Sequence, residues 1–240
     1  MNAGSKILIV MAAGSGSRMG SSLPKQFLDL DGKPILRYTM ETFISAVPGL
    51  KVVTVLPKEH IPYWKEYCLS RDFSYPQLLV AGGITRFHSV RNALVKVPDD
   101  AIVAIHDGVR PLVSAGLVGR MFSEMASGKV RALIPVLPSV DTLKLAERVK
   151  DASGEERLVP AKGEVDRSKV FCAQTPQMFL SRDIKEAYSQ AYDTAFTDDA
   201  SVADRKGIPL SFCEGERYNF KITTPEDLEL ARMIISWSRR

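Results

Sequence analysis

The sequence predicts an α/β fold, in which a mostly parallel sheet carries helices on both of its faces. Two observations predict this fold: short, continuous apolar runs recur along the 240 residues, and helix-like stretches separate them. Continuous apolar runs are typical of strands buried on both faces, as in parallel sheets. Strands that alternate with helices predict such a sheet, because each connecting helix packs against one of its faces. We expect a single domain over residues 1–240.

The expected strands are the runs rich in Val, Ile and Leu: Ile7–Met11, Val52–Leu56, Gln77–Ala81, Ala101–His106, Ala132–Val136 and Val170–Ala173. The expected helices space their apolar residues three and four positions apart: Ile35–Ser45, Ser89–Val95, Leu117–Met125, Ile184–Ala191 and Pro225–Ile235. The last of these has a typical helix start, with Thr224 as N-cap and Pro225 in the first helical position. Ligands of such sheets bind at the carboxyl ends of the strands.

A β-arm is expected at about residues 142–167, where the alternation of strands and helices is interrupted. Thr142–Leu145 has the character of a strand, Asp151–Glu156 is charged and turn-like, and Arg157–Pro160 is short and extended. An arm without a core of its own is usually covered by a second subunit. A mobile surface loop is the alternative interpretation of this segment.

Composition indicates an ordinary soluble protein and argues against two classes of partner. The net charge of +4 is small, and no basic run is interleaved with aromatic residues, so we expect no nucleic acid. Ile7–Val10 is too short for the apolar part of a signal peptide, and no apolar stretch reaches the ~20 residues of a membrane span. Cys68, Cys172 and Cys213 lie far apart and fit reduced, structural thiols of a cytoplasmic protein.

The first strand leads into a loop that suits phosphate groups. Gly14 and Gly16 let the backbone curl closely around a ligand, and successive N–H groups of such a loop bind anions. Arg18 and Lys25 add positive charge beside it. The loop lacks the Lys-Ser/Thr ending of a P-loop, and Met19 stands where a dinucleotide-binding fingerprint has its third glycine. We interpret it as a polyphosphate site; the glycines alone also fit an ordinary tight turn.

The segment Ile105–Pro111 predicts a metal site at a second strand end. Asp107 follows an apolar strand and could supply one of the few carboxylates that Mg²⁺ needs when phosphates provide its other ligands. Capping the next turn or pairing with Arg110 is the alternative role. We expect His106 to be a packed residue at the strand end rather than a catalytic base. Near a third strand end, Gly83 would let a flat base approach the backbone, and Ser89 either donates to that base or caps the helix.

Several motifs together carry a resemblance to a known family. They are A-A-G-x-G-x-R-M from Ala12, P-K-Q from Pro24, Q-T-P-Q from Gln174, T-D-D-A-S from Thr197 and N-F-K-I-T from Asn219. The first two resemble the signature of nucleotidyltransferases that join a sugar or polyol phosphate to a nucleotide. In this order, over about Ile7 to Ala231, the set resembles the cytidylyltransferases of the non-mevalonate isoprenoid pathway. Those enzymes join 2-C-methyl-D-erythritol 4-phosphate to CTP and release diphosphate.

The resemblance implies a Rossmann-like three-layer sandwich with a projecting β-arm, and a homodimer formed through that arm. It implies that the residues that wrap CTP and contact its base and ribose are Ala12, Ala13, Gly14, Ser15, Gly16, Gly83, Ser89 and Gly108. It places Arg18 and Lys25 at the phosphates and Asp107 at the metal. It implies a polyol-phosphate side formed by Arg110, Thr142, Arg167, Thr175, Thr197 and Lys221. Thr142 and Arg167 flank the arm, so they are expected to serve the neighbouring subunit's site; the arm is longer than the family usually shows.

The chemistry of this reaction agrees with the residues present. A phosphate monoester is already ionised and nucleophilic, so the site has only to cancel charge and hold two polyanions in line. Arg18, Lys25, Lys221 and a Mg²⁺ ion on Asp107 supply that charge, and we expect the three cations to be catalytic. Three other functions are weighed: a ribitol 5-phosphate cytidylyltransferase, a nucleotide-sensing protein without turnover, and a dehydrogenase, against which the missing third glycine counts.

Overall fold

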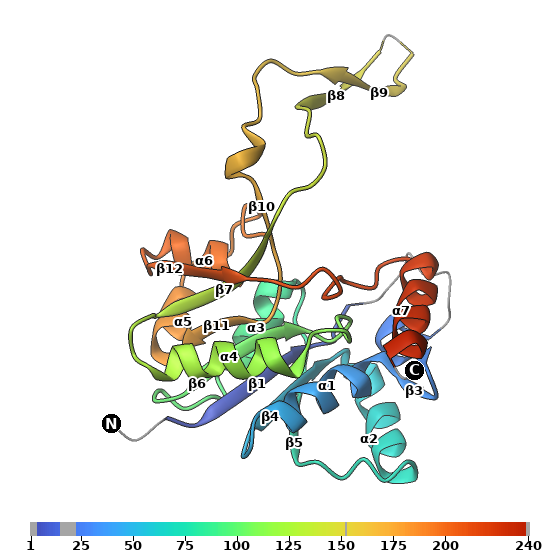
Figure 1. The fold of residues 1–240 in the computed structure, drawn as a ribbon, viewed down its shortest axis with the longest axis vertical. Coiled ribbons are helices and arrows are strands. Elements are labelled where there is room, and N and C mark those ends of the chain that lie inside the picture. The colour runs from blue at the N-terminus through green and yellow to red at the C-terminus, as the bar shows by residue number, and fades with distance from the viewer. Residues whose placement is uncertain (1–3, 15–22, 152, 239–240) are drawn as a thin grey trace.

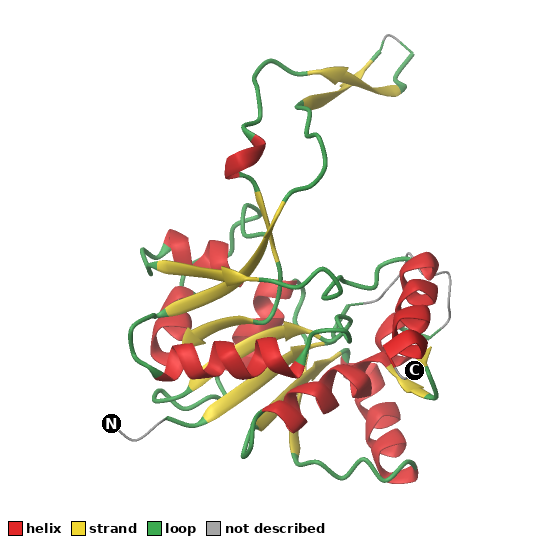
Figure 2. Ribbon diagram, in the orientation of Figure 1, coloured by secondary structure: helices red, strands yellow, loops and turns green. Residues whose placement is uncertain are grey.

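The computed structural model describes residues 4–14, 23–151 and 153–238. Its main sheet has the strand order β10-β7-β11-β6-β1-β4-β5, and β12 pairs with β7. Helices lie on both sides of this sheet, and a thin arm extends away from it at the top of Figure 1. Figure 2 shows the same arrangement by type of element. The predicted α/β class with a mostly parallel sheet and a projecting arm is therefore confirmed.

The parallel half of the sheet is built around the first strand. β1 (Lys6–Met11) lies between β4 (Lys51–Leu56) and β6 (Ile102–Asp107), and β5 (Gln77–Ala81) pairs with β4. All four strands run in the same direction, so their carboxyl ends meet at one edge. Leu8, Ile9 and Val10 are completely buried, as expected of a strand covered on both faces.

The other half of the sheet is mixed. β7 (Ala132–Pro138) pairs in antiparallel fashion with β10 (Phe171–Ala173) and β11 (Gln177–Leu180), and in parallel with β12 (Leu210–Glu214). β11 also pairs with β6 and so joins the two halves. The sequence interpretation did not include β11 or β12. β11 is short, and β12 alternates polar and apolar residues, so neither is a continuous apolar run.

Each face of the sheet has its own core. Ile7, Ile9 and Val53 pack with α3 (Arg86–Leu94), α5 (Ser181–Ala187) and α6 (Asp199–Arg205). Leu8 and Val10 face the other way, towards α1 (Ile35–Ala46), α2 (Ile61–Ser70) and α4 (Ala115–Ala126). This alternation follows from the two-residue period of a strand. α2 was not among the expected helices.

A third, smaller core forms beside the sheet. α7 (Pro225–Ser238) packs on the hairpin of β2 (Asp29–Leu30) and β3 (Lys33–Pro34), which precedes α1. Single turns of 3₁₀ helix occur at Lys25–Phe27, Lys58–His60 and Arg167–Lys169. Among the described residues, no helix is long and apolar enough to cross a membrane.

The arm is a two-stranded antiparallel hairpin of β8 (Ala146–Lys150) and β9 (Glu156–Pro160). Most of its side chains are exposed, and Leu158 remains 65% exposed. The expected strand at Thr142–Leu145 is wrong, because Thr142–Leu145 is irregular and the strand starts at Ala146. The extended character of Arg157–Pro160 is confirmed.

Candidate active site

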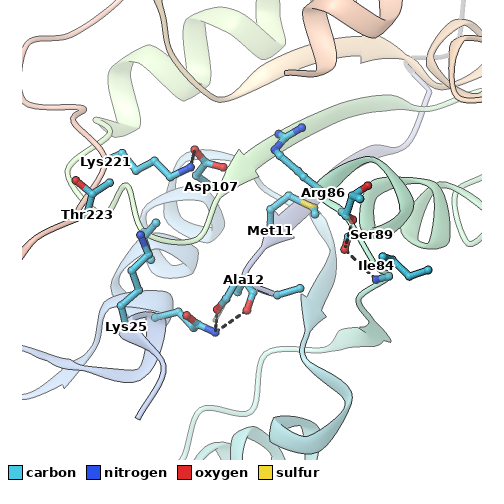
Figure 3. Close-up of a pocket in the computed structure, with 15 residues that line it drawn as sticks. Met11, Ala12, Lys25, Ile84, Arg86, Ser89, Asp107, Lys221 and Thr223 are labelled. Carbon is cyan, nitrogen blue, oxygen red and sulfur yellow. Dashed lines mark hydrogen bonds and ion pairs between the residues drawn. The ribbon is translucent and has the colours of Figure 1, made fainter. Parts of the chain in front are cut away.

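A cavity of about 550 Å³ opens at the carboxyl ends of β1, β5 and β6. In the described part of the chain it is lined by Met11, Ala12, Ala13, Gly14, Lys25, Gln26, Gly83, Ile84, Thr85, Arg86, Ser89, Asp107, Val109, Lys221 and Thr223. Figure 3 shows these side chains converging from the two ends of the chain and from its middle. Its position is the one that open α/β sheets use for ligands.

The loop after β1 forms one wall of the cavity. The amide nitrogen of Gln26, a buried residue, donates to the carbonyl oxygens of Ala12 (2.7 Å) and Gly14 (3.2 Å). Gln26 therefore fixes the backbone of this loop, a role that sequence reasoning did not assign, although the motif P-K-Q contains it. The expected ligands Ser15, Gly16 and Arg18 lie outside the described residues.

Two lysines reach this cavity from distant parts of the sequence. Lys25, at the start of the 3₁₀ turn that follows the loop, donates from its Nζ atom to the carbonyl oxygen of Ile222 (3.0 Å). Lys221, in the segment before α7, places its Nζ atom 3.1 Å from Oδ2 of Asp107. Figure 3 shows both side chains on the same side of the cavity. The structure thus brings together two of the three cations expected to be catalytic.

The turn between β5 and α3 forms the opposite wall. The Ser89 hydroxyl accepts a hydrogen bond from the N–H of Gly83 (2.9 Å) and donates one to the carbonyl oxygen of Thr85 (3.0 Å). A Cβ atom at Gly83 would lie 2.5 Å from the Cβ atom of His88, so only glycine fits. The expected capping role of Ser89 is wrong: the helix begins at Arg86, and Thr85 is its N-cap.

Asp107 ends β6 and is the carboxylate at the centre of the site. Its Oδ2 atom accepts from Arg110 Nε (3.3 Å) and contacts Lys221, while no described residue donates a hydrogen bond to Oδ1. Burial alone would raise the pKa of this carboxyl, but Lys221, Arg86 and Arg110 outweigh burial and hold the pKa well below its usual range. Asp107 is therefore ionised at neutral pH. The pairing with Arg110 that sequence reasoning kept as an alternative is present, and it leaves one carboxylate oxygen available for a cation.

Gly108 lies behind the cavity rather than on its surface. A Cβ atom there would lie 3.1 Å from side chains of Leu36 and Val10, and its carbonyl oxygen accepts from Thr39 (3.0 Å). A larger residue here would push these side chains aside by a few tenths of an ångström, so close packing at this turn favours glycine.

The expected polyol-phosphate residues fall into two groups. Arg110, Thr175 and Lys221 surround Asp107: the hydroxyl of Thr175 accepts the backbone N–H of Asp107 (3.1 Å). Thr142, Arg167 and Thr197 are exposed and do not line the described cavity of their own chain. Arg167 lies at the base of the arm and donates to the carbonyl oxygen of Val140 (3.3 Å).

Arg86 and Asp199 are site residues that sequence reasoning missed. The guanidinium of Arg86 lines the cavity and holds both carboxylate oxygens of Asp199, at 2.8 and 2.5 Å. Asp199 is completely buried and also accepts the hydroxyl of Tyr188. Burial would lower the pKa of Arg86, but Asp199 outweighs burial and raises it. The pair joins α3 to α6, and T-D-D-A-S was the only signal of it in the sequence.

The cavity suits a cation held mainly by phosphate groups. Within the described residues, no group of three or more His, Cys, Asp or Glu side chains could hold a metal by itself. Asp107 is the one carboxylate among the described lining residues, and a single carboxylate is what Mg²⁺ commonly takes from a protein when substrate phosphates complete its shell. His106 is fully buried, and burial lowers its pKa to about 4, so it is neutral and is no ligand on the cavity surface.

Two lysines and one carboxylate at the strand ends of an α/β sheet suit the joining of two phosphate compounds, as nucleotidyltransferases perform it. The family IspD, 2-C-methyl-D-erythritol 4-phosphate cytidylyltransferase, matches residues 6–237, and the chain belongs to this family. A 2-C-methyl-D-erythritol 4-phosphate cytidylyltransferase from Bacteroides thetaiotaomicron is 42% identical, with 95% of this chain and 98% of that protein aligned.

Solved structures agree with this membership. The crystal structure of 4-diphosphocytidyl-2C-methyl-D-erythritol synthase from Anaerococcus prevotii is similar with a TM-score of 0.76 and 26% identity, over 98% of this chain and 97% of that one. The cytidylyltransferase from Thermus thermophilus gives a TM-score of 0.67 and 30% identity, over 97% and 98%.

Removal of the Asp199 carboxylate tests the pair with Arg86. We expect Asp199→Ala to lower the free energy of unfolding by about 3 kcal/mol, because the Arg86 charge loses its buried partner. Asp193 is the matched control: it also pairs with an arginine, Arg205, but both side chains are exposed, so Asp193→Ala should cost less than about 1 kcal/mol. Urea denaturation measures both values. Equal losses in the two variants would contradict a structural role of the buried pair.

Proposed function

We propose that this protein transfers CMP from CTP to 2-C-methyl-D-erythritol 4-phosphate, giving the CDP-polyol and diphosphate. Membership of the family over residues 6–237 supports this proposal. The observation that carries it in the structure is the placement of Lys25, Lys221 and Asp107 in one cavity at the strand ends. Two polyanions have to meet there, and this set of charges suits them.

The reaction needs positioning and charge rather than a protein nucleophile. An oxygen of the substrate phosphate attacks the α-phosphorus of CTP, and the bond from that phosphorus to the bridging oxygen of diphosphate breaks. The electron pair leaves with diphosphate, and no proton has to move because both phosphates are ionised. Lys25 and Lys221 stabilise the negative charge that spreads over the transferred group. A Mg²⁺ ion on Asp107 would neutralise phosphate charge and align the CTP phosphates.

In this proposal the two substrates bind at different walls of the cavity. The turn with Gly83 and Ser89 offers a close-packed backbone surface for the cytosine base, and Ala12, Ala13 and Gly14 lie beneath the nucleotide. Arg18, Ser15 and Gly16 belong to the same loop in the sequence and complete the phosphate contacts in this proposal. Gly108 supports the ribose side by bringing the turn close to Val10.

The polyol phosphate binds on the side of Asp107, Arg110, Thr175 and Lys221 in this proposal. Thr197 lies at the start of the segment that Arg86 ties to the cavity through Asp199, which supports its place near the acceptor. Thr142 and Arg167 flank the arm, and neither lines the described cavity of its own chain. They act in the site of a second subunit.

Exposed apolar side chains near the arm support a homodimer as the working form in this proposal. Phe171 beside its base and Phe212 on β12 are 52% and 65% exposed, and Leu158 on the hairpin is exposed as well. Phe171 and Phe212 line one depression together with Ile134, Val136 and Leu210, and a contiguous exposed apolar patch of this kind marks an interaction surface. A second copy of the protein would cover them and receive Arg167 and Thr142 in its own cavity.

The acceptor is tested by offering CTP with either of two polyol phosphates. Release of diphosphate should be fast with 2-C-methyl-D-erythritol 4-phosphate and at least about tenfold slower, in kcat/KM, with ribitol 5-phosphate, because shape differences in a polar site discriminate strongly. Faster turnover of ribitol 5-phosphate would assign the other acceptor. Binding of CTP without release of diphosphate with either acceptor would contradict the proposed activity.

Loss of either lysine should slow chemistry. We expect Lys25→Ala and Lys221→Ala each to lower kcat by ~10²-fold or more, since each removes a preorganised cation from the transferring phosphate. Arg18→Ala should act in the same way. Lys96, an exposed lysine beyond the end of α3, is the control, and Lys96→Ala should retain full kcat. Near-normal kcat in a cavity variant would remove that residue from the catalytic set.

Asp107 should govern the metal dependence. Asp107→Asn keeps the shape of the side chain but offers a poor ligand for a hard cation, so half-saturation of activity should need at least ~10-fold more Mg²⁺. Asp99→Asn changes an exposed carboxylate that pairs with Lys185 and should leave the magnesium titration unchanged. An unchanged titration in Asp107→Asn would restrict Asp107 to its ion pairs.

Mixing inactive variants tests whether the arm acts across the dimer. A heterodimer of Lys25→Ala and Arg167→Ala regains one intact site if Arg167 serves its neighbour, so activity should rise above that of both parents as subunits exchange. The pair Lys25→Ala and Lys221→Ala is the control, because both lysines line the cavity of one chain and no site is restored. Proven heterodimers of the first pair without a rise would place Arg167 in its own subunit's site or outside any site.

A further inference from the structure

Four residues behind the cavity form a closed set of hydrogen bonds, which we call the buried polar ring: His106, Arg110, Asn219 and Thr175. His106 Nε2 bonds to the carbonyl oxygen of Arg110 (3.1 Å), and Arg110 donates from a guanidinium nitrogen to the carbonyl oxygen of Asn219 (2.7 Å). Asn219 donates from its amide to the carbonyl oxygen of Thr175 (2.8 Å), and the Thr175 hydroxyl lies 3.1 Å from His106 Nδ1.

The ring joins three segments that each carry a residue of the site. His106 and Arg110 flank Asp107, Thr175 lies in the Q-T-P-Q segment, and Asn219 is two residues before Lys221. His106, Thr175 and Asn219 are buried, so their hydrogen bonds do not compete with water. Two ring members bond to Asp107 directly. The Thr175 hydroxyl accepts the backbone N–H of Asp107 (3.1 Å), and Arg110 donates its backbone N–H to the Asp107 carbonyl oxygen (3.0 Å) and its Nε to Oδ2 (3.3 Å).

The direction of the bonds in the ring follows from the chemistry of the groups. A carbonyl oxygen only accepts, so Nε2 of His106 must carry a proton to bond to Arg110. The other nitrogen, Nδ1, lies 3.1 Å from the Thr175 hydroxyl and is the only acceptor within hydrogen-bond distance of that hydroxyl among the described residues, so the hydroxyl is its donor. The same hydroxyl oxygen accepts from Asp107. The single proton of Thr175 is therefore committed to His106.

We propose that His106 and Thr175 are positioning residues, which fix the Asp107–Arg110 turn and do not donate to the substrate phosphate. This inference rests on the proposed function of the cavity. A phosphate oxygen is an acceptor, and Thr175 has no second proton to give it. His106 acts indirectly: its Nδ1 atom orients the hydroxyl of Thr175, and its Nε2 atom holds the backbone of Arg110.

A pair of threonine variants separates positioning from direct binding. Thr175→Val keeps the shape of the side chain but removes its hydroxyl, and should lower kcat about 10-fold or more at saturating substrates. Affinity for CTP without added metal, measured by calorimetry, should change less than about twofold, because the walls that hold the nucleotide are untouched. Thr175→Ser restores the hydroxyl and should recover most of kcat. Thr42, whose hydroxyl bonds within α1, is the control, and Thr42→Val should retain full kcat.

Two histidine variants then divide the ring into its halves. The His106→Asn variant places an amide oxygen, which accepts, near the position of Nδ1. The His106→Gln variant places an amide nitrogen, which donates, near the position of Nε2. In the His106→Gln protein the partner of Thr175 is already lost, so adding Thr175→Val should lower kcat little further. In the His106→Asn protein Thr175→Val should lower kcat almost as much as it does in the wild type. Equal, additive costs of Thr175→Val in both backgrounds, or a rise in the KM for the polyol phosphate alone with kcat unchanged, would overturn the proposal.

A spectroscopic test does not depend on turnover. Nitrogen-15 NMR of the three imidazoles, with His106 assigned from its loss in His106→Gln, should show a proton on Nε2 of His106 and none on Nδ1. A proton on Nδ1 would overturn the inference even in an active enzyme. An enzyme without turnover of either polyol phosphate, but with the Nε2 proton in place, would contradict the proposed function and leave the hydrogen-bond assignment confirmed.

Discussion

The charge of Asp107 is the constraint on which the site depends. A carboxylate buried at the end of a central strand is stable only if cations lie close to it, and here Lys221 and Arg110 contact the same oxygen. Arg86 adds to their field from the other side of the cavity. Each cation comes from a different segment: Arg110 from the turn after β6, Arg86 from the start of α3 and Lys221 from the segment before α7. Neutralising the Asp107 carboxylate therefore holds these three segments near one another.

The parallel core could be predicted from sequence because its signal is local. Burial on both faces requires continuous apolar runs, and β1, β4 and β6 have them. The motifs could likewise be assigned to one site, and in the structure Lys25, Gly83, Asp107 and Lys221 all line one cavity. What they bind remains a prediction of the chemistry and of the family.

The remaining features depend on tertiary contacts that a local pattern does not show. β12 looks polar in isolation and becomes a strand because it lies beside β7. The pair of Arg86 and Asp199 spans two helices far apart in sequence, and neither residue by itself differs from a surface charge. Sequence reasoning predicted His106 to be a packed residue, which is correct, but its hydrogen bonds to Thr175 and Arg110 could not be predicted without the fold.

The order in which the chain is synthesised has a consequence for when this cavity can work. Lys25 bonds to the carbonyl oxygen of Ile222, and Lys221 neutralises Asp107, so an early and a central segment are both completed by one late segment. The parallel strands β1, β4 and β6 all precede that segment in the sequence, so until it is in place Asp107 has, among the described residues, only Arg110 and Arg86 to balance its charge. The charge balance of the cavity is thus completed by one of the last segments of the chain to be synthesised.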